Sequence, residues 1–351
     1  MKALRLEKWK SDPVLVDVPQ PAPGPGEVVV RVGGAGACHS DLHLFREFDT
    51  GQLPWGPPFT LGHENAGWVH ALGTGVTGWE PGQAVAVHGP WGCGTCGRCL
   101  LGVDTYCENP AAAPVPGGGG GLGMDGGMAE FMLVPHARHL VPLPEPLDPV
   151  TAAPLTDAAL TPYHAVRRSW SKLVPGTTAV VIGIGGLGHL AVQIVKATTA
   201  VRVIAVDTRP EALALAEESG ADFALGADDR VAETIRRRTG GRGADVVIDC
   251  VGNDATLALG AAVARTLGDL TIVGLGGGTL PVSFFALPYE LSVQTTYWGS
   301  RPELVEVLDL AARGLVHTKI TRFGLAEAPE AYRLLEAGGI TGRAVVVPSE
   351  A

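Results

Sequence analysis

Residues 177–207 read TTAVVIGIGGLGHLAVQIVKATTAVRVIAVD, and this stretch decides the fold of the second half of the chain. It contains an apolar strand, a glycine-rich turn, a helix and a second apolar strand. The alternation continues through GADVVIDCVG at 243–252 and LTIVGLGG at 270–277. Short, fully apolar strands separated by helices are typical of a parallel sheet covered on both faces. We therefore predict an α/β domain with a doubly wound parallel sheet.

The turn of this stretch has the G-x-G-x-x-G spacing of a dinucleotide site. Glycine is needed there for a tight turn, for backbone approach to a pyrophosphate and for close packing of helix on strand. Asp207 ends the second strand, where its carboxylate suits a ribose 2′-hydroxyl and favours NAD over NADP. The alternatives are that Asp207 caps the next helix and that Arg209 accommodates a 2′-phosphate. The predicted cofactor-binding residues of this segment are Gly183, Gly185, Gly186, Leu187, Gly188, Asp207 and Arg209.

The first third of the chain has a different composition and residue pattern. It is rich in glycine and proline, with short β-branched runs such as EVVVRV at 27–32 and AVAVHG at 84–89. This pattern predicts an irregular, strand-rich domain. The run Gly117–Gly121 predicts a mobile loop unless other residues pack on it. The tail, residues 328–348, predicts a helix and a last strand whose place in the fold the pattern does not give.

Length and composition narrow the classes of function. A chain of 351 residues is long enough for two domains. The net charge of −10 and the lack of basic runs argue against nucleic acid as a partner. No apolar run approaches the roughly 20 residues that cross a membrane, and the charged first twelve residues do not resemble a secretory signal. We expect a cytoplasmic protein with a small-molecule partner, in which clustered cysteines bind metal rather than form disulfides.

Four of the six cysteines lie within residues 93–107, with the spacing C-x2-C-x2-C-x7-C. Two-residue gaps allow a short loop to place thiolates around a tetrahedral zinc ion. A site with four sulfur ligands has no open position, so we predict a structural zinc at Cys93, Cys96, Cys99 and Cys107. An iron–sulfur cluster and redox thiols are the alternatives.

A second group of metal-binding residue types surrounds GACHSDLH at 36–43 and LGHENAG at 61–67. A catalytic zinc needs three protein ligands and one open position. Cys38 and His63 supply two of them. Asp157 is a candidate for the third, and Glu64 is its rival; the alternative role for Asp157 is a helix N-cap.

With these residues identified, the chain resembles the zinc-dependent medium-chain alcohol dehydrogenases, most closely the bacterial NAD-dependent secondary-alcohol dehydrogenases. The resemblance rests on GHENAGWVHALGTGV at 62–76, the four-cysteine lobe, VVIGIGGLG at 180–188 and GRAVVVP at 342–348. It implies a GroES-like catalytic domain wrapped around a Rossmann domain. The implied limits are 1–157 for the catalytic domain, with its zinc lobe at about 89–110, then 158–297 for the NAD-binding domain and 298–351 for the return to the catalytic domain.

The resemblance also implies roles for single residues. Cys38, His63 and Asp157 bind the catalytic zinc, with Glu64 beside it as an exchanging ligand or a neighbour of the ligands. Ser40 takes the substrate proton, and His43 matches the relay histidine of some members. The implied pyrophosphate contacts are His39 and Arg343. The implied substrate pocket is Trp55, Leu122, Tyr297 and Trp298, for which the alternative is ordinary core packing.

The expected function is reversible hydride transfer between secondary alcohols or ketones and NAD, with two zinc ions per chain in a homo-oligomer, a tetramer rather than a dimer. The first alternative is a dehydrogenase of the same family for primary alcohols, aromatic alcohols or polyols, although apolar Trp55 and Trp298 argue against polyols. The second is a non-catalytic nucleotide-binding structural protein. A non-catalytic protein has no need of an open zinc site, and this argues against the second alternative. The residues that would form such a site are all present: Cys38, Ser40, His63 and Asp157.

Overall fold

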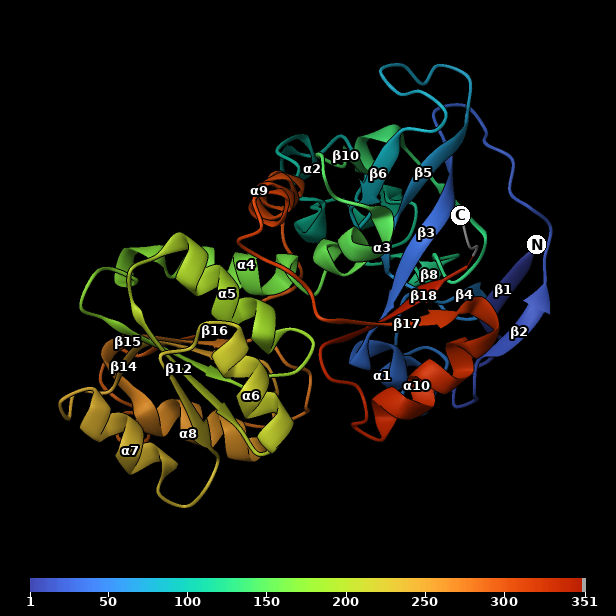
Figure 1. Cartoon of the computed structure of the whole chain (residues 1–351). Coiled ribbons are helices and arrows are strands. Elements are labelled where there is room, and N and C mark those ends of the chain that lie inside the picture. Colours follow the sequence, from blue (N-terminus) through green and yellow to red (C-terminus); the bar gives the residue numbers. More distant parts are fainter. Residues whose placement is uncertain (349–351) are drawn as a thin grey trace. The chain divides into compact units, whose positions relative to one another are not determined.

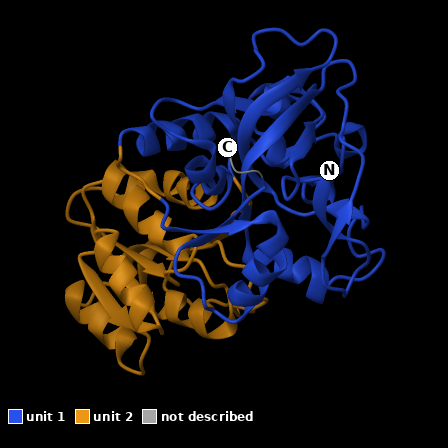
Figure 2. Cartoon of the chain, turned by 45° about the vertical axis from the view of Figure 1, so that its right-hand side comes forward, with its two compact units in different colours: residues 1–160, 299–313, 318–351 blue, residues 161–298, 314–317 orange. Residues whose placement is uncertain are grey.

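The computed structural model describes residues 1–348 and divides them into two compact units (Figure 1, Figure 2). Unit 1 consists of residues 1–160, 299–313 and the chain from 318 onward, and unit 2 consists of residues 161–298 and 314–317. Unit 1 is therefore built from segments at both ends of the chain. The limits of the functional domains, with breaks at 157/158 and 297/298, remain predictions beside these geometric limits.

The main sheet of unit 1 has the order β10-β6-β5-β3-β18-β17, and β9 also pairs with β3. All of its pairs are antiparallel except β17 with β18. The strands are β3 (Val28–Ala37), β5 (Glu64–Leu72), β6 (Ala84–Val87), β9 (Phe131–Val134), β10 (Leu140–Pro142), β17 (Ile320–Gly324) and β18 (Arg343–Val347). Nine of the ten residues of β3 are buried, as expected for the centre of a covered sheet.

The tail of the chain, whose place the sequence pattern does not give, adds an interior strand to this sheet between β3 and the edge strand β17. Strand β18 pairs with β3, and Ala344 lies opposite Ala37. This register brings Arg343, the first residue of β18, beside the end of β3 that leads into Cys38. The last strand of the chain therefore borders residues from its first forty.

Two smaller sheets and a set of short helices complete unit 1. The sheets are β2-β1-β4, made of β1 (Lys2–Leu6), β2 (Val14–Asp17) and β4 (Phe59–Thr60), and the pair β7 (Gly119–Gly120) with β8 (Gly123–Met124). The α-helices are α1 (His39–Arg46), α2 (Gly97–Leu100), α3 (Pro149–Ala152), α9 (Arg301–Ala312) and α10 (Ala328–Glu336). The 3₁₀ helices are η1 (Asp104–Tyr106), η2 (Pro110–Ala112), η3 (Ala137–His139), η4 (Ala153–Thr156) and η6 (Leu325–Glu327). Within residues 1–348, the structure contains no helix long and apolar enough to cross a membrane.

The glycine segment at 117–127 is largely buried in unit 1, and other residues pack on it, which is the condition under which we expect no mobile loop. The amides of Gly126 and Gly127 donate to the carbonyls of Thr60 and Gly62, at 2.8 and 2.9 Å. A Cβ added to Gly121 would lie 2.6–2.8 Å from backbone atoms of Gly62 and His63. The glycines thus allow two backbones to approach more closely than side chains permit.

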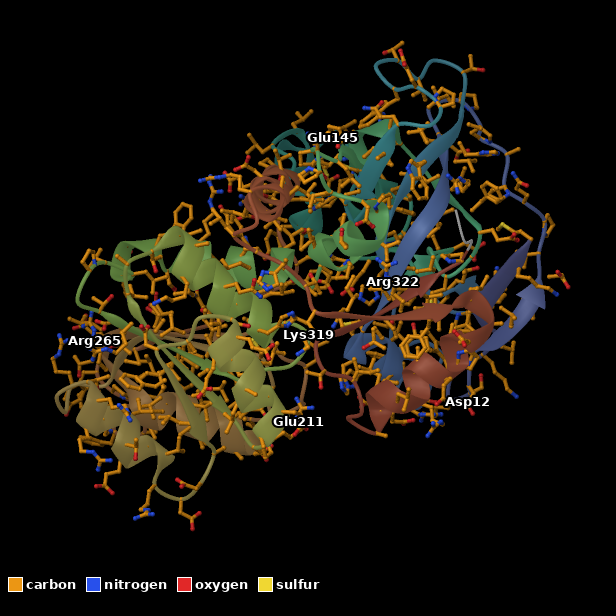
Figure 3. The ribbon with its side chains drawn as sticks, viewed as in Figure 1. Asp12, Glu145, Glu211, Arg265, Lys319 and Arg322 are labelled. Carbon is orange, nitrogen blue, oxygen red and sulfur yellow. The ribbon has the colours of Figure 1, made fainter. Side chains whose placement is uncertain are left out.

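Unit 2 is a six-stranded parallel sheet of order β13-β12-β11-β14-β15-β16. The strands are β11 (Thr178–Ile182), β12 (Arg202–Asp207), β13 (Phe223–Gly226), β14 (Ala244–Asp249), β15 (Ala264–Ile272) and β16 (Ser292–Thr295). The helices are α4 (Leu160–Arg168), η5 (Trp170–Lys172), α5 (Gly188–Thr198), α6 (Pro210–Glu218), α7 (Val231–Arg238) and α8 (Asp254–Val263). Arg265, labelled in Figure 3, donates from Nε to Asp245 at 2.5 Å and so links β15 to β14. The predicted doubly wound fold is confirmed.

The strand order of unit 2 places a ligand crevice at a known position. The chain runs outward from β11 through β12 to β13 and then returns to β14 on the other side of β11. Ligands of such sheets bind at the carboxyl ends of the strands where the order reverses. Gly183 follows β11 at this point, and Gly252 follows β14.

Candidate active site and metal centres

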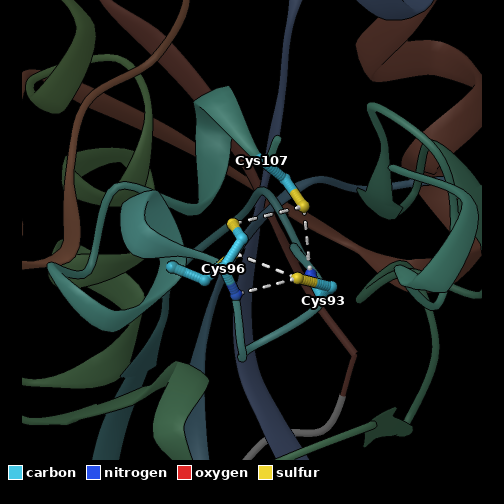
Figure 4. A group of neighbouring side chains, drawn as sticks. Cys93, Cys96 and Cys107 are labelled. Atoms are coloured by element: carbon cyan, nitrogen blue, oxygen red, sulfur yellow. Dashed lines mark hydrogen bonds between the residues drawn. The ribbon is translucent and has the colours of Figure 1, made fainter. Parts of the chain in front are cut away.

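The four cysteines of the lobe come together around one point. Figure 4 shows three of them, Cys93, Cys96 and Cys107. The Sγ atoms of Cys93 and Cys99 lie 4.0 Å apart, and so do those of Cys96 and Cys107. Four ligands at about 2.3 Å from a tetrahedral zinc ion lie about 3.8 Å from one another. All six cysteines of the chain are free. The spacing and the sulfur-only donor set therefore fit a structural zinc without rearrangement of the loop.

Backbone amides favour the thiolate form in this lobe. The amide of Cys93 donates to Cys107 Sγ at 3.3 Å, and the amide of Cys96 donates to Cys93 Sγ at 3.4 Å. The backbone amide of Thr95 is the largest cause that lowers the pKa of Cys93 to about 6. Zinc binds the thiolate and not the thiol, so these amides prepare the lobe for the metal.

The second centre collects Cys38, His63, Glu64 and Asp157, whose ligand atoms all lie within 4.8 Å of one another. Cys38 ends the link from β3 to α1, His63 precedes β5, and Asp157 follows η4. One sulfur, one imidazole nitrogen and carboxylate oxygens form a donor set that suits zinc. The structure thus brings together residues that lie up to 119 positions apart in the sequence.

The carboxylate of Asp41 faces the imidazole of His63. Asp41 Oδ1 lies 3.0 Å from His63 Nδ1, while His63 Nε2 lies 3.4 Å from both Asp157 Oδ2 and Ser40 Oγ. When the proton is on Nδ1, facing the carboxylate, the lone pair is on Nε2, on the side of Asp157. That lone pair can then bind a metal ion. Asp41 also accepts from the amide of Cys38 at 3.0 Å and from the Tyr332 hydroxyl at 2.7 Å.

Sequence reasoning did not assign Asp41 or Tyr332. Asp41 lies inside the quoted stretch GACHSDLH, and a carboxylate beside a ligating histidine is the usual partner of its second nitrogen, so the signal was present. Tyr332 lies on α10 and gave no signal, because only the folded chain places that helix against α1.

Glu64 belongs to the same group of candidate metal ligands, and Arg343 holds its carboxylate. Arg343 Nε donates to Glu64 Oε2 at 3.0 Å, and Nη2 donates to Oε1, with both side chains buried. A Cβ on Gly36 would lie 1.8 Å from Glu64 Oε2, so the carboxylate occupies the space over a glycine. Burial raises the pKa of Glu64, and Arg343 opposes that rise. The predicted contact of Arg343 with a pyrophosphate remains a prediction.

The charge of Arg343 also acts on the thiol of Cys38. Burial raises its pKa, but the charge of Arg343 and the hydrogen bond with His63 outweigh burial, and the pKa falls to about 7. A thiol that ionises near neutrality is a suitable zinc ligand.

The other predicted site residues of unit 1 differ in how far they are buried. His43 has 27% of its side chain exposed, and its Nδ1 lies 2.7 Å from Glu47 Oε1. His39 is exposed at the first position of α1. Trp55 packs edge-on against Phe59 with ring centroids 5.7 Å apart.

The predicted pocket residues fall in both units. Leu122 and Trp55 are partly buried against the core of unit 1. Tyr297 and Trp298 belong to unit 2, where Trp298 is buried and Tyr297 is exposed. Their shared role in one pocket stays a prediction.

The glycine turn of unit 2 has the geometry that its spacing requires. Gly183 has a φ of +84°, which favours glycine, and a Cβ on Gly188 would lie 1.9 Å from the Gly183 carbonyl oxygen. A Cβ on Gly185 would meet nothing within 4 Å, so the turn presents open backbone there. Asp207 accepts from the amides of Ile184 and Arg209, at 2.7 and 2.9 Å. The carboxylate thus ties the turn to the start of α6.

Comparison with known proteins identifies the family. Residues 24–145 match the alcohol dehydrogenase GroES-like domain, and residues 186–313 match the zinc-binding dehydrogenase domain. The NAD-dependent alcohol dehydrogenase of Sulfurisphaera tokodaii is 38% identical over 360 residues, which covers 99% of this chain and 100% of the relative. The chain belongs to the zinc-dependent medium-chain alcohol dehydrogenase family.

Solved structures of the family match over the full length as well. The alcohol dehydrogenase of the archaeon Aeropyrum pernix superposes with a TM-score of 0.90 at 38% identity, covering 99% of this chain and 100% of that chain. The acetophenone reductase of Geotrichum candidum, solved in complex with NAD, gives 0.84 at 32% identity, covering 99% and 97%. The predicted family, enzyme class and cofactors are confirmed: this alcohol dehydrogenase is an NAD-dependent oxidoreductase with one catalytic and one structural zinc.

Proposed function

We propose that this alcohol dehydrogenase acts on secondary alcohols and the corresponding ketones. The proposal rests on the apolar surface of the glycine segment, residues 117–127, which packs beside the zinc ligand His63. Gly121 packs against the backbone of His63, and we infer that the next residue, Leu122, borders the substrate site. A Cβ on Gly123 would lie 2.6 Å from the Trp55 ring, which places that ring beside the same loop. The substrate carbon therefore meets apolar surface that suits two carbon substituents.

In the proposed reaction, different residues of unit 1 hold the zinc, receive the substrate proton and pass that proton to solvent. Cys38, His63 and Asp157 hold the catalytic zinc. When bound, the zinc polarises the substrate oxygen as a Lewis acid, and NAD supplies the hydride acceptor. Ser40, half-buried with its hydroxyl toward His63, receives the hydroxyl proton of the alcohol. His43, partly exposed and paired with Glu47, passes that proton toward solvent.

We assign the third ligand position to Asp157 rather than Glu64. Both oxygens of Glu64 are engaged by Arg343, whereas Asp157 Oδ2 lies 3.4 Å from the metal-facing nitrogen of His63. Glu64 then acts as a charged neighbour that exchanges into the ligand set only when Arg343 releases it.

Primary and aromatic alcohols are the alternative substrates within the family, and polyols are less compatible with the apolar surface. The name of the Geotrichum candidum relative, acetophenone reductase, gives a ketone as substrate and supports the secondary-alcohol assignment. A ketone of this kind corresponds to a secondary alcohol after reduction.

The first experiment compares initial rates of NAD reduction with 2-octanol and 1-octanol under identical conditions. We expect kcat/KM at least about tenfold higher for 2-octanol, which corresponds to about 1.4 kcal/mol of transition-state binding. A preference for 1-octanol would move the enzyme to the primary-alcohol alternative and leave the zinc and NAD assignments intact.

We also propose that the enzyme is a cytoplasmic homo-oligomer, a tetramer rather than a dimer. Val282, Phe284, Phe285 and Tyr289 expose 57–87% of their surface within eight residues of unit 2, and clustered exposed apolar residues mark interaction surfaces. The free state of all six cysteines supports a reducing compartment. Light scattering after size-exclusion chromatography tests the subunit number, and Phe285→Asp is expected to lower it. A monomeric wild-type enzyme would contradict this proposal.

A further inference from the structure

The chain returns from unit 2 to unit 1 at residues 299–302. The long segment of unit 2 ends at Trp298, and unit 1 resumes at Gly299. Ser300 then caps α9 through a reciprocal pair with Glu303, whose Oε2 accepts from the Ser300 amide at 2.7 Å and from its hydroxyl at 2.8 Å. We refer to residues 299–302 as the crossover segment.

The four-cysteine lobe and its border bind this segment at three points. The carbonyl of Gly299 accepts two hydrogen bonds, from Thr105 Oγ1 at 3.1 Å and from His88 Nε2 at 2.9 Å. The amide of Arg301 donates to the carbonyl of Gly102 at 2.8 Å. Gly102 and Thr105 both lie between the zinc ligands Cys99 and Cys107. The lobe that holds the structural zinc is therefore also the surface that holds the crossover segment.

The fit between lobe and crossover segment leaves no room for additional side chains. Gly102 has a φ of +73°, and a Cβ there would lie 2.8 Å from Pro302 Cδ. Next to Thr105, Asp104 is bound by the Arg138 guanidinium, which also donates to the carbonyl of Gly92 at 2.5 Å. Because Arg138 ties Asp104 to the lobe, the neighbouring Thr105 is held in place only while the lobe is folded.

The residue before the crossover segment has an uncommon backbone conformation. Trp298 has a φ of +56°, in the left-handed region that a bulky residue rarely adopts, and its side chain is buried. Such a conformation costs about 1–3 kcal/mol and persists only where surrounding contacts enforce it. The doubly bonded carbonyl of Gly299 is the next backbone anchor along the chain.

We propose that Thr105 and His88 are positioning residues that anchor the crossover segment to the structural-zinc lobe and thereby fix the backbone of Trp298. The structural zinc then has a second role besides folding its own loop, since loss of the metal frees the anchor. The contacts above carry the anchor itself. Only its effect on substrate binding rests on the proposed function, together with the prediction that Trp298 lines the substrate pocket.

Hydrogen–deuterium exchange of the amides at 299–304, read by mass spectrometry on the zinc-loaded enzyme, tests the anchor directly. Thr105→Val removes one donor to Gly299, and we expect exchange there about 3- to 10-fold faster. Cys96→Ser, which loses one zinc per chain, is expected to accelerate the same amides by more than about tenfold. Thr198→Val is the matched control, because it removes a hydroxyl that donates to the Ile194 carbonyl at 2.7 Å, away from the crossover segment. Wild-type exchange at 299–304 in both variants would overturn the anchor.

Kinetics test the link to Trp298. For Thr105→Val with two zinc ions retained, we expect the KM for a secondary alcohol to rise about 3- to 10-fold while kcat and the KM for NAD stay within about twofold. A variant whose crossover segment loosens but whose alcohol KM is unchanged would overturn that link. Failure of the wild-type enzyme to oxidise secondary alcohols would contradict the proposed function instead, and the exchange result would stand apart from it.

Discussion

Arg343 and Glu64 form a buried ion pair that joins the last strand of the main sheet to the strand that follows a zinc ligand. The two residues are 279 positions apart in the sequence. Removing one partner of such a pair leaves an uncompensated charge in the interior.

Replacement of Arg343 is therefore expected to destabilise the enzyme strongly. For Arg343→Met we predict a loss of about 3–5 kcal/mol in the free energy of unfolding, measured by urea titration of the zinc-loaded protein. The double variant Glu64→Gln/Arg343→Met removes both charges and should recover at least about 1 kcal/mol of that loss. If the single and double variants unfold at the same urea concentration, the pair is not what stabilises this region.

The two acidic candidates for the third ligand position can be separated by counting metal. We expect Asp157→Asn to reduce the zinc content from about two ions per chain to about one, because an amide is a poor zinc ligand. Glu64→Gln should keep about two. Elemental analysis after exhaustive desalting measures both variants, and the opposite pattern would exchange the roles of the two residues.

We predict that Tyr332 supports the catalytic zinc through Asp41. Removal of its hydroxyl in Tyr332→Phe takes away one donor from the carboxylate that faces His63. We predict a zinc affinity about 10-fold weaker at the catalytic centre, measured by competition with a chromogenic chelator. Tyr289→Phe, at an exposed tyrosine of unit 2, serves as the control, and its subunit number is measured as well because Tyr289 belongs to the proposed interaction surface. Equal affinities in the two variants would show that Asp41 holds His63 without help.

The glycine segment offers a matched pair of substitutions. Gly117 and Gly121 both have positive φ, +64° and +80°, so alanine strains the backbone at each. A Cβ at Gly121 meets the backbone of Gly62 and His63, whereas a Cβ at Gly117 meets nothing within 4 Å. Gly121→Ala should thus cost about 1–3 kcal/mol more than Gly117→Ala in thermal or urea unfolding, and it alone should weaken catalytic zinc. Equal costs would mean that the close packing is not required.

The buried ring of His139 makes the free energy of unfolding depend on pH. Its ring is buried against Trp91, and neither ring nitrogen has a hydrogen-bond partner among the described residues. Burial, then the charges of Arg138, His88, His136 and Arg301, lower its pKa well below 6.5. The unfolded chain therefore binds a proton below about pH 6.5 that the folded chain does not, and stability falls as the pH falls.

His139→Phe should remove up to about 1.4 kcal/mol per pH unit from the slope of unfolding free energy between pH 6.5 and 5. The exposed His70 provides the control variant His70→Phe. Identical slopes in wild type and His139→Phe would show that other groups carry the acid sensitivity.

Local sequence features predicted the chemistry of this enzyme better than its packing. The cysteine spacing and the glycine turn each lie within a short window, and their geometry follows from that window alone. The partners of the ligands do not: Tyr332 and Arg343 reach the metal site only because α10 and β18 return to unit 1. The sequence also could not name the residues that pack on the glycine segment, because those contacts come from Gly62 and His63 rather than from the segment's own conformational preference.

The central place of β18 also bears on how the protein is made. A ribosome adds residues one by one, and β3 and Glu64 leave it long before residue 343 does. Until then the nascent catalytic unit has an open sheet edge along β3 and an acidic side chain without its partner. Long-range pairing of this kind is slow and leaves strand edges exposed to aggregation. We therefore expect the NAD-binding unit, which is continuous in sequence apart from residues 314–317, to fold while synthesis is still under way, and the catalytic unit to follow release of the chain.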